Sequence, residues 1–332
     1  MEFERLYTGL VGRISGLRAR RYVAELARFH RIQASPGYDE ALDVVREALE
    51  GAEIDAQVSS FPADGRMETY GWPAPTGWRI RSGALFEVEP EERTLCRFDE
   101  VPTSILGQSA GGSAEGELVH VGRGTASEDL DGVDLAARFV LTCGRAKDLA
   151  ERIRGRGAVG LIVYPDVQRA EPSYDMVQYG GLFPTADEVE TTPMGFSISR
   201  RAADRLIERL QTGTVRLRGE VDAEISDGTM RVLDATIPGT DPQAGTVLLV
   251  AHLCHPSPSA NDNASGSGLL LEVATALAEE ARSGALRNGV RLLWVPEFHG
   301  TIPWAAANAE SLRSVRYVIN LDMVGQSPER LG

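Results

Sequence analysis

The hydrophobic and polar positions of residues 18–50 follow a helical period. Apolar side chains recur every three or four positions on both sides of the turn-forming stretch SPGYDE, which predicts two amphipathic helices. The apolar positions are Tyr22, Leu26, Phe29, Leu42, Val45 and Leu49. After Gly51 the period changes, because IDAQVSSF alternates like a half-buried strand and RSGALFEVEP is a second strand-like run. The chain therefore begins with helices and continues into a sheet.

The Gly/Ser cluster GQSAGGSAEG at positions 107–116 predicts a domain boundary. Beyond it the strand-like runs are GELVHVGRG, RFVLTCG, AVGLIVYPD and MGFSISRRAADRLIERL, with AKDLAERIRGRG as a helix. We expect residues 111–224 to form a β-rich insert. Residues 1–110 and 225–332 then form one α/β domain, because the N-terminal helices have no sheet to cover until apolar strands appear near residue 246.

Three apolar strands in the last third of the chain each end beside a polar side chain. They are TVLLVAH, which ends at His252, VRLLWVPE, which ends at Glu297, and RYVINLDMVG, which contains Asp322. The stretch GSGLLLEVATALAEEARSG between the first two is helical in pattern. Strands that are apolar on both faces belong to the interior of an α/β sheet. Since such sheets bind ligands at the carboxyl ends of their strands, we expect these three polar side chains to converge.

The polar side chains at these positions match the ligands of a catalytic zinc site. Zinc accepts imidazole nitrogen and carboxylate oxygen, and a catalytic site has about three protein ligands and one open position. His252, Asp262 and Asp322 supply such a set, and Glu297 is then available as a general base. Asp262 also lies where an acid commonly caps a helix. The other three are equally compatible with a core histidine, a surface carboxylate and a turn residue, so the pattern alone leaves both interpretations open.

Composition narrows the class of protein. The 34 Lys and Arg against 48 Asp and Glu give a net charge of −14, and no basic run interrupts this balance, so we expect no nucleic-acid or membrane partner. Three cysteines, Cys96, Cys143 and Cys254, are too few for a disulfide framework. The N-terminus lacks the apolar core of a signal peptide, and no run reaches membrane-spanning length. We therefore expect a cytoplasmic protein.

Three blocks of the sequence resemble the core of the zinc aminopeptidase family with co-catalytic metal sites, and most closely its bacterial aminopeptidase-like subgroup. The blocks are AHLCHPSPSANDNASGSGLLLEVATAL, WVPEFHGTIPWA and VINLDMVG, in the right order and spacing. Residues from about 116 to 218 are similar to the protease-associated domain that many members insert before the first metal ligand. The resemblance implies an α/β fold: a three-layer zinc-peptidase domain with a mixed central sheet, and an inserted β-rich protease-associated domain.

The resemblance assigns roles to four residues. His252 matches the first metal-binding histidine, and Asp262 matches the aspartate that bridges two metals. Glu297 matches the general base, and Asp322 matches the aspartate that completes the first metal site. The implied activity is that of a zinc-dependent hydrolase, which removes an N-terminal residue from a peptide or cleaves a related small amide.

Two positions depart from the family's pattern. Cys254 stands where the two-metal enzymes have an aspartate that orients the histidine ring. Phe298 replaces the second carboxylate, a ligand of the second metal, and a phenyl ring cannot bind zinc. The family's remaining histidine ligand lies well downstream of the DMVG block, so we expect the C-terminal part of the domain to lie outside this sequence. These departures predict one tightly bound zinc ion.

His255 and His299 are the nearby side chains that could complete a second metal site, and they could equally bind substrate. A nucleophilic role for Cys254 is the weaker interpretation, because adjacent cysteine and histidine side chains on an extended backbone do not face each other. We interpret this cysteine as a small buried residue beside the site. His30 and His120 are given no role.

Two other functions are consistent with the same residues. The degenerate positions fit a non-catalytic binding or scaffold protein that keeps the fold, and metal analysis would separate that protein from a hydrolase. The metal could also serve acyl transfer or cyclisation on the same fold, which only substrate profiling would detect. Neither the side-chain preference for substrate nor the oligomeric state follows from the sequence.

Overall fold

Two separate β-sheets organise the chain. The computed structural model describes residues 2–166 and 173–326. The chain divides into unit 1, which is Met1–Ala63, Met67–Ala74 and Gly228–Gly332, and unit 2, which is Asp64–Arg66 and Pro75–Asp227. The units therefore separate at residue 75, and not at the Gly/Ser cluster where we expected the boundary. The physical reason is strand pairing, because the strands of residues 77–97 pair within the sheet of unit 2.

The sheet of unit 1 is mixed and has the strand order β1-β11-β13-β12-β14. Its strands are β1 (Ala56–Ala63), β11 (Gly228–Ile237), β12 (Thr246–His252), β13 (Gly289–Val295) and β14 (Val315–Asn320). The pairs β1·β11 and β11·β13 are antiparallel, whereas β13·β12 and β12·β14 are parallel. Unit 1 also has a short hairpin, β2 (Glu68–Thr69) and β3 (Trp72–Pro73). The carboxyl ends of the parallel strands thus share one edge of the sheet.

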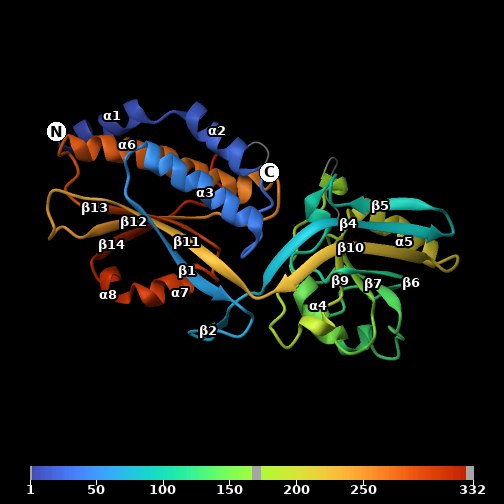
Figure 1. The fold of residues 1–332 in the computed structure, drawn as a ribbon. Coiled ribbons are helices and arrows are strands. Elements are labelled where there is room, and N and C mark those ends of the chain that lie inside the picture. Colours follow the sequence, from blue (N-terminus) through green and yellow to red (C-terminus); the bar gives the residue numbers. More distant parts are fainter. Residues whose placement is uncertain (1, 167–172, 327–332) are drawn as a thin grey trace. The chain divides into compact units, whose positions relative to one another are not determined.

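Helices cover both faces of this sheet, as Figure 1 shows. One face carries α1 (Glu2–Arg13), α2 (Gly16–Leu26), α3 (Pro36–Gly51) and α6 (Gly266–Arg282), and the other carries α7 (Thr301–Ala307) and α8 (Ala309–Leu312). The predicted helices of residues 18–50 correspond to α2 and α3, whereas α1 has no counterpart in the sequence analysis. Ser35 begins α3, because its Oγ accepts a hydrogen bond from the N–H of Tyr38. No helix within the described residues is long and apolar enough to span a membrane.

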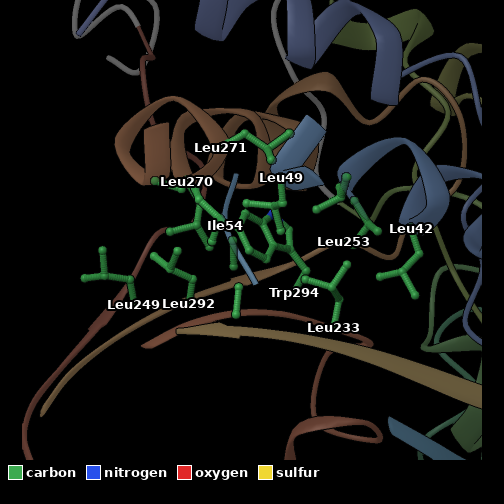
Figure 2. Packing of buried hydrophobic residues seen from close by; sticks show 14 of the residues in the cluster. Leu42, Leu49, Ile54, Leu233, Leu249, Leu253, Leu270, Leu271, Leu292 and Trp294 are labelled. Atoms are coloured by element: carbon green, nitrogen blue, oxygen red, sulfur yellow. The ribbon is translucent and has the colours of Figure 1, made fainter. Parts of the chain in front are cut away.

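The larger core of unit 1 lies between the sheet and helices α3 and α6 (Figure 2). Trp294 is fully buried there, and its Nε1 donates a hydrogen bond to the carbonyl of Ser267, 3.2 Å away. A smaller cluster on the opposite face packs Trp304 of α7 against Leu248 and Leu293. Apolar side chains therefore point to both faces of the central strands, which confirms the three-layer α/β prediction for this unit.

The prediction that all three apolar strands lie inside the sheet is wrong for β14. This strand is at the edge of the described sheet, paired only with β12. Tyr317, Val318 and Ile319 are 70%, 62% and 48% exposed. A run that is apolar on both faces predicts burial, but no helix within the described residues covers these side chains.

The sheet of unit 2 has the strand order β5-β4-β10-β6-β7-β8-β9. The strands are β4 (Gly77–Glu89), β5 (Arg93–Arg97), β6 (Gly112–His120), β7 (Arg138–Thr142), β8 (Gly160–Val163), β9 (Met194–Ser197) and β10 (Arg216–Ser226). Helices α4 (Ala146–Ile153) and α5 (Arg200–Leu210) accompany the parallel half. MGFSISRRAADRLIERL is not one strand: it becomes β9 followed by α5, because the Oγ of Ser199 accepts the N–H of Ala202 and begins a helix.

Candidate metal centre

His252, Asp262 and Asp322 come together at the carboxyl ends of two parallel strands. His252 is the last residue of β12 and is 4% exposed. Asp322 lies two residues after the end of β14, and Asp262 lies in the kinked segment η5 (Ala260–Ser265) before α6. The Nε2 atom of His252 is 3.2 Å from Oδ1 of Asp262 and 3.5 Å from Oδ1 of Asp322. Of the three side chains predicted to converge, His252 and Asp322 therefore lie together, and Glu297 shares a second potential ligand group with His252.

The spacing of these three ligand atoms fits a zinc ion. All three lie within 4.8 Å of one another. Two ligands at about 2.0–2.2 Å from one tetrahedral zinc are about 3.3–3.6 Å apart, close to the separations of the histidine nitrogen from the two carboxylates. The donor set also has the right chemistry, because one neutral imidazole and two carboxylates balance a divalent cation.

Asn263 connects the three segments that carry these ligands. Its Nδ2 donates to the carbonyls of His252 (3.2 Å) and Leu321 (2.9 Å). Its Oδ1 accepts from the N–H groups of Gly266 (3.0 Å) and Met323 (3.2 Å). The side chain is fully buried and its amide is satisfied at both ends. Asn263, rather than its acidic neighbour, therefore accepts the hydrogen bond at the start of α6.

Cys254 lies between His252 and Glu297, the residues that the sequence predicts as a metal ligand and as the general base. Its Sγ accepts a hydrogen bond from the backbone N–H of Glu297 at 3.1 Å, and it lies 3.7 Å from Nδ1 of His252. The Nε2 of Gln33 donates to the same sulfur (3.7 Å) and to the carbonyl of Glu297 (3.3 Å). Cys254 is 2% exposed. The sulfur thus contacts His252 on the side opposite the candidate metal position.

His255 also lies at the site, beside Asp262 and Glu297. The Nδ1 of His255 is 3.6 Å from Oδ1 of Asp262, and its Nε2 is 3.9 Å from Oε2 of Glu297. Two backbone hydrogen bonds with Arg31 hold the residue. A second potential ligand group joins His252, Cys254, His255 and Glu297. The ring of His299, the other candidate histidine, packs on Trp72, with centroids 5.8 Å apart.

The charges at the site favour a cation. A hydrogen bond from His252 lowers the pKa of Asp262. Burial by itself lowers the pKa of His252, but the hydrogen bonds to Asp262 and Cys254 outweigh burial and raise that pKa well above its usual range. Burial raises the pKa of Glu297, which suits a general base working near neutral pH. The imidazole of His252 therefore binds a proton strongly. A metal ion would compete with that proton for Nε2, the nitrogen that faces the two carboxylates.

Sequence reasoning missed Arg31, Gln33 and Asn263. The guanidinium of Arg31 is fully buried and donates to the carbonyls of Leu253 (2.8 Å) and Ser259 (3.2 Å), so it shapes the loop that carries His255. Arg31 and Gln33 are more than 200 positions from the site residues Leu253 and Cys254 that they contact, and no local pattern indicates such a partner. Asn263 is one of several small polar residues in ANDNASG, and nothing in the stretch separates it from its neighbours.

A sequence-family model described as "Domain of unknown function (DUF4910)" matches residues 20–330. A curated Clostridium acetobutylicum protein is 27% identical over 133 residues, and its name combines polysaccharide biosynthesis with an aminopeptidase-like domain. The match covers 40% of this chain and 28% of that protein, so the chain spans little more than a quarter of the relative's length.

Solved structures share the fold at low sequence identity. A zinc aminopeptidase from Bacillus subtilis superimposes with a TM-score of 0.64 at 17% identity, over 95% of this chain and 71% of that one. A peptidase M28 precursor from Shewanella amazonensis gives a TM-score of 0.67 at 16% identity, over 96% of this chain and 73% of that one. The chain therefore has the fold of the zinc aminopeptidases and M28 peptidases, as the three sequence blocks predicted.

Proposed function

The chain belongs to the family described as domain of unknown function (DUF4910), and we propose that its unit 1 is a zinc-dependent hydrolase of aminopeptidase type. It cleaves an N-terminal residue from a peptide or a related amide. The observation that carries the proposal is the spacing of Nε2 of His252 from the carboxylates of Asp262 and Asp322, 3.2 and 3.5 Å. The aminopeptidase-type fold supports it.

Each side chain has a distinct role in this reaction. His252, Asp262 and Asp322 would hold one zinc ion. When bound, the ion supplies Lewis-acid polarisation of the scissile carbonyl and acidifies the attacking water. Glu297 takes a proton from that water as its oxygen attacks the carbonyl carbon, and it passes the proton to the leaving amine as the C–N bond breaks. The raised pKa of this carboxyl favours both transfers near neutral pH.

The number of metal ions follows from counting donors. Phe298 offers no ligand, so a second ion sharing Asp262 would have to recruit His255, which is 3.6 Å from that carboxylate. The proposal is one tightly bound zinc. Substrate binding is then the remaining role for His255, whose Nε2 faces Glu297.

Unit 2 is proposed to be a protease-associated-like insert. Its residues, Asp64–Arg66 and Pro75–Asp227, fall in sequence between the first and last segments of unit 1, Met1–Ala63 and Gly228–Gly332. It has its own seven-stranded sheet and its own apolar core, in which Leu149 and Leu161 are buried. These features support an insert that folds around its own sheet, as the sequence resemblance implies.

The experiment compares chelator-stripped and zinc-reconstituted protein on aminoacyl amides and on their N-acetylated forms. Only the zinc-loaded protein should hydrolyse the amides, and acetylation should abolish the reaction. Glu297→Gln should retain zinc and lose at least about a hundredfold in kcat. Glu310→Gln, at an exposed carboxylate, is the matched control and should be unchanged. Full activity in Glu297→Gln would contradict the assignment, and absence of stoichiometric zinc would favour the non-catalytic binding protein.

A further inference from the structure

A pocket of about 500 Å³ lies in unit 2, at the carboxyl ends of its parallel strands, and is here called the strand-end pocket. Strands β7, β8 and β9 run parallel and end at Thr142, Val163 and Ser197. The volume is that of a small-molecule site, and α/β sheets bind ligands at this edge. Six of the side chains that line the pocket are Cys143, Arg145, Lys147, Tyr164, Tyr179 and Phe183.

The charged side chains of the strand-end pocket are mainly cationic. Arg145 and Lys147 flank the first residue of α4, and Lys147 is the only lysine in the sequence. The acidic side chain of the lining, Asp166, forms an ion pair with Arg123. The guanidinium of Arg145 is largely exposed, and its Nε is 4.0 Å from the carboxylate of Asp148. Two cations against one neutralised carboxylate leave the lining with a net positive charge.

The start of α4 adds to this positive potential. Arg145 precedes the helix, and its side chain makes no hydrogen bond to the first turn, whereas serines cap α2, α3 and α5. The N–H groups of a first helical turn carry positive partial charge, so cations beside them are repelled. An anion in the pocket would remove this conflict, because it accepts hydrogen bonds from these N–H groups and pairs with the two cations.

Aromatic side chains supply the apolar part of the lining. Tyr164 is 7% exposed, and its hydroxyl shares a hydrogen bond of 2.8 Å with Nε2 of His120. Tyr179 and Phe183 also line the pocket, and Tyr179 is 37% exposed. A Cβ on Gly181 would lie 2.4 Å from Cε2 of Phe183, so glycine allows this ring to lie against the backbone. The pocket therefore offers aromatic surface beside its cations.

We propose that the strand-end pocket binds a small organic oxyanion, a phosphate or carboxylate group attached to a planar apolar body. Arg145 and Lys147 pair with the oxyanion at the start of α4, and the rings of Tyr179 and Phe183 contact the body. The proposal concerns unit 2 alone. It therefore does not depend on metal binding or hydrolysis in unit 1.

The single lysine allows a direct test by chemical labelling. Pyridoxal 5′-phosphate carries an aldehyde, an aromatic ring and a phosphate. Its aldehyde condenses with the ε-amine and releases water, and borohydride then reduces the C=N bond to a stable secondary amine. This reagent should label Lys147 at least about tenfold faster than pyridoxal does, after each rate is divided by the rate for Nα-acetyllysine. Mass spectrometry of the digested chain separates Lys147 from the α-amino group. Equal corrected rates would overturn the proposal.

Calorimetry on the full chain supplies the second arm. Phenyl phosphate and benzoate should bind, and the tighter of the two identifies the preferred oxyanion. Benzyl alcohol lacks the charge and inorganic phosphate lacks the ring, so each should bind at least about tenfold more weakly than phenyl phosphate. Failure of both phenyl phosphate and benzoate to bind would overturn the proposal.

Variants test whether the strand-end pocket is the site of binding. Arg145→Gln and Lys147→Gln should each weaken phenyl phosphate binding about tenfold, and Lys147→Arg, which keeps the charge, should retain most of the affinity. Tyr179→Ala should weaken the binding of phenyl phosphate more than that of inorganic phosphate. Arg93→Gln, at an exposed arginine of β5, is the control and should leave binding unchanged. Full affinity in a protein that carries both Arg145→Gln and Lys147→Gln would overturn the proposal.

Discussion

The backbone N–H of Glu297 donates a hydrogen bond to Sγ of Cys254 over 3.1 Å. The same sulfur lies 3.7 Å from Nδ1 of His252, the ring nitrogen opposite the one that faces Asp262. One side chain thus links the proposed base to the proposed metal ligand. Metal-binding histidines commonly donate their other ring N–H to an acceptor that fixes the ring, and the sulfur occupies that position here.

We predict that Cys254→Ala weakens zinc binding by about 10- to 100-fold and lowers kcat, because His252 and Glu297 both lose a shared acceptor. Cys254→Asp should restore most of the affinity, since a carboxylate accepts the same donors. Competition with a chromogenic chelator measures the affinity, and Cys96→Ala, at a buried cysteine of unit 2, is the control. Unchanged zinc affinity in Cys254→Ala would show that another group orients the ring.

Asn263→Asp should destabilise unit 1 and abolish tight zinc binding. The substitution replaces the Nδ2 donor with a carboxylate oxygen that faces the carbonyls of His252 and Leu321, in a fully buried position. Lost donors and a buried charge together cost at least about 2 kcal/mol in the free energy of unfolding. Urea denaturation measures the loss. Asn261→Asp adds the same charge to the same loop without removing these bonds, so a similar loss there would contradict the explanation.

Much of the site could be predicted from strand ends alone. A buried parallel strand is a continuous apolar run, so the polar residue at its carboxyl end is visible in the sequence, as with His252 and Glu297. The role of Asp262 is harder to predict, because its loop equally suits a helix cap. Only the three-block resemblance favours a role as a metal ligand. In the structure Asn263, and not Asp262, accepts the hydrogen bond from the N–H of Gly266 at the start of the helix. The carboxylate of Asp262 is therefore not used as the helix cap.

Other features depend on distant partners and leave no local signal. Residues 77–97 join unit 2 because β4 pairs with β10, more than 120 positions later, whereas the Gly/Ser cluster only suggested a boundary. Arg31 approaches its carbonyl partners from another element. The edge position of β14 could not be predicted either, because an apolar run does not indicate whether another strand or a helix covers it.

Gly268→Ala should destabilise unit 1 by up to about 2 kcal/mol. A Cβ there would lie 2.9 Å from Cγ2 and 3.0 Å from the backbone nitrogen of Val23, so α2 and α6 would have to separate. Overpacking of this kind costs about 1–3 kcal/mol, which exceeds the gain of about 1 kcal/mol in helix propensity. Gly51→Ala, at the end of α3 with open space around it, is the control and should be neutral or stabilising. Thermal unfolding of both variants measures the difference.

Finally, His30 should make the stability of unit 1 depend on pH. Burial, and next the charge of Arg31, lower the pKa of His30 from 6.5 to about 4. The unfolded chain therefore binds this proton between pH 6.5 and 4 whereas the folded chain does not, so stability falls as the pH decreases through that range. The loss approaches about 3 kcal/mol below pH 4.

His30→Asn keeps an acceptor for the N–H of Ser257, which lies 3.3 Å from Nδ1, but does not titrate. Urea unfolding at pH 7.5, 5.5 and 4.5 should therefore show a smaller loss of stability in the variant. The pH 7.5 measurement isolates any packing defect. If the free energy of unfolding falls equally with decreasing pH in the two proteins, His30 is not the source of the pH dependence.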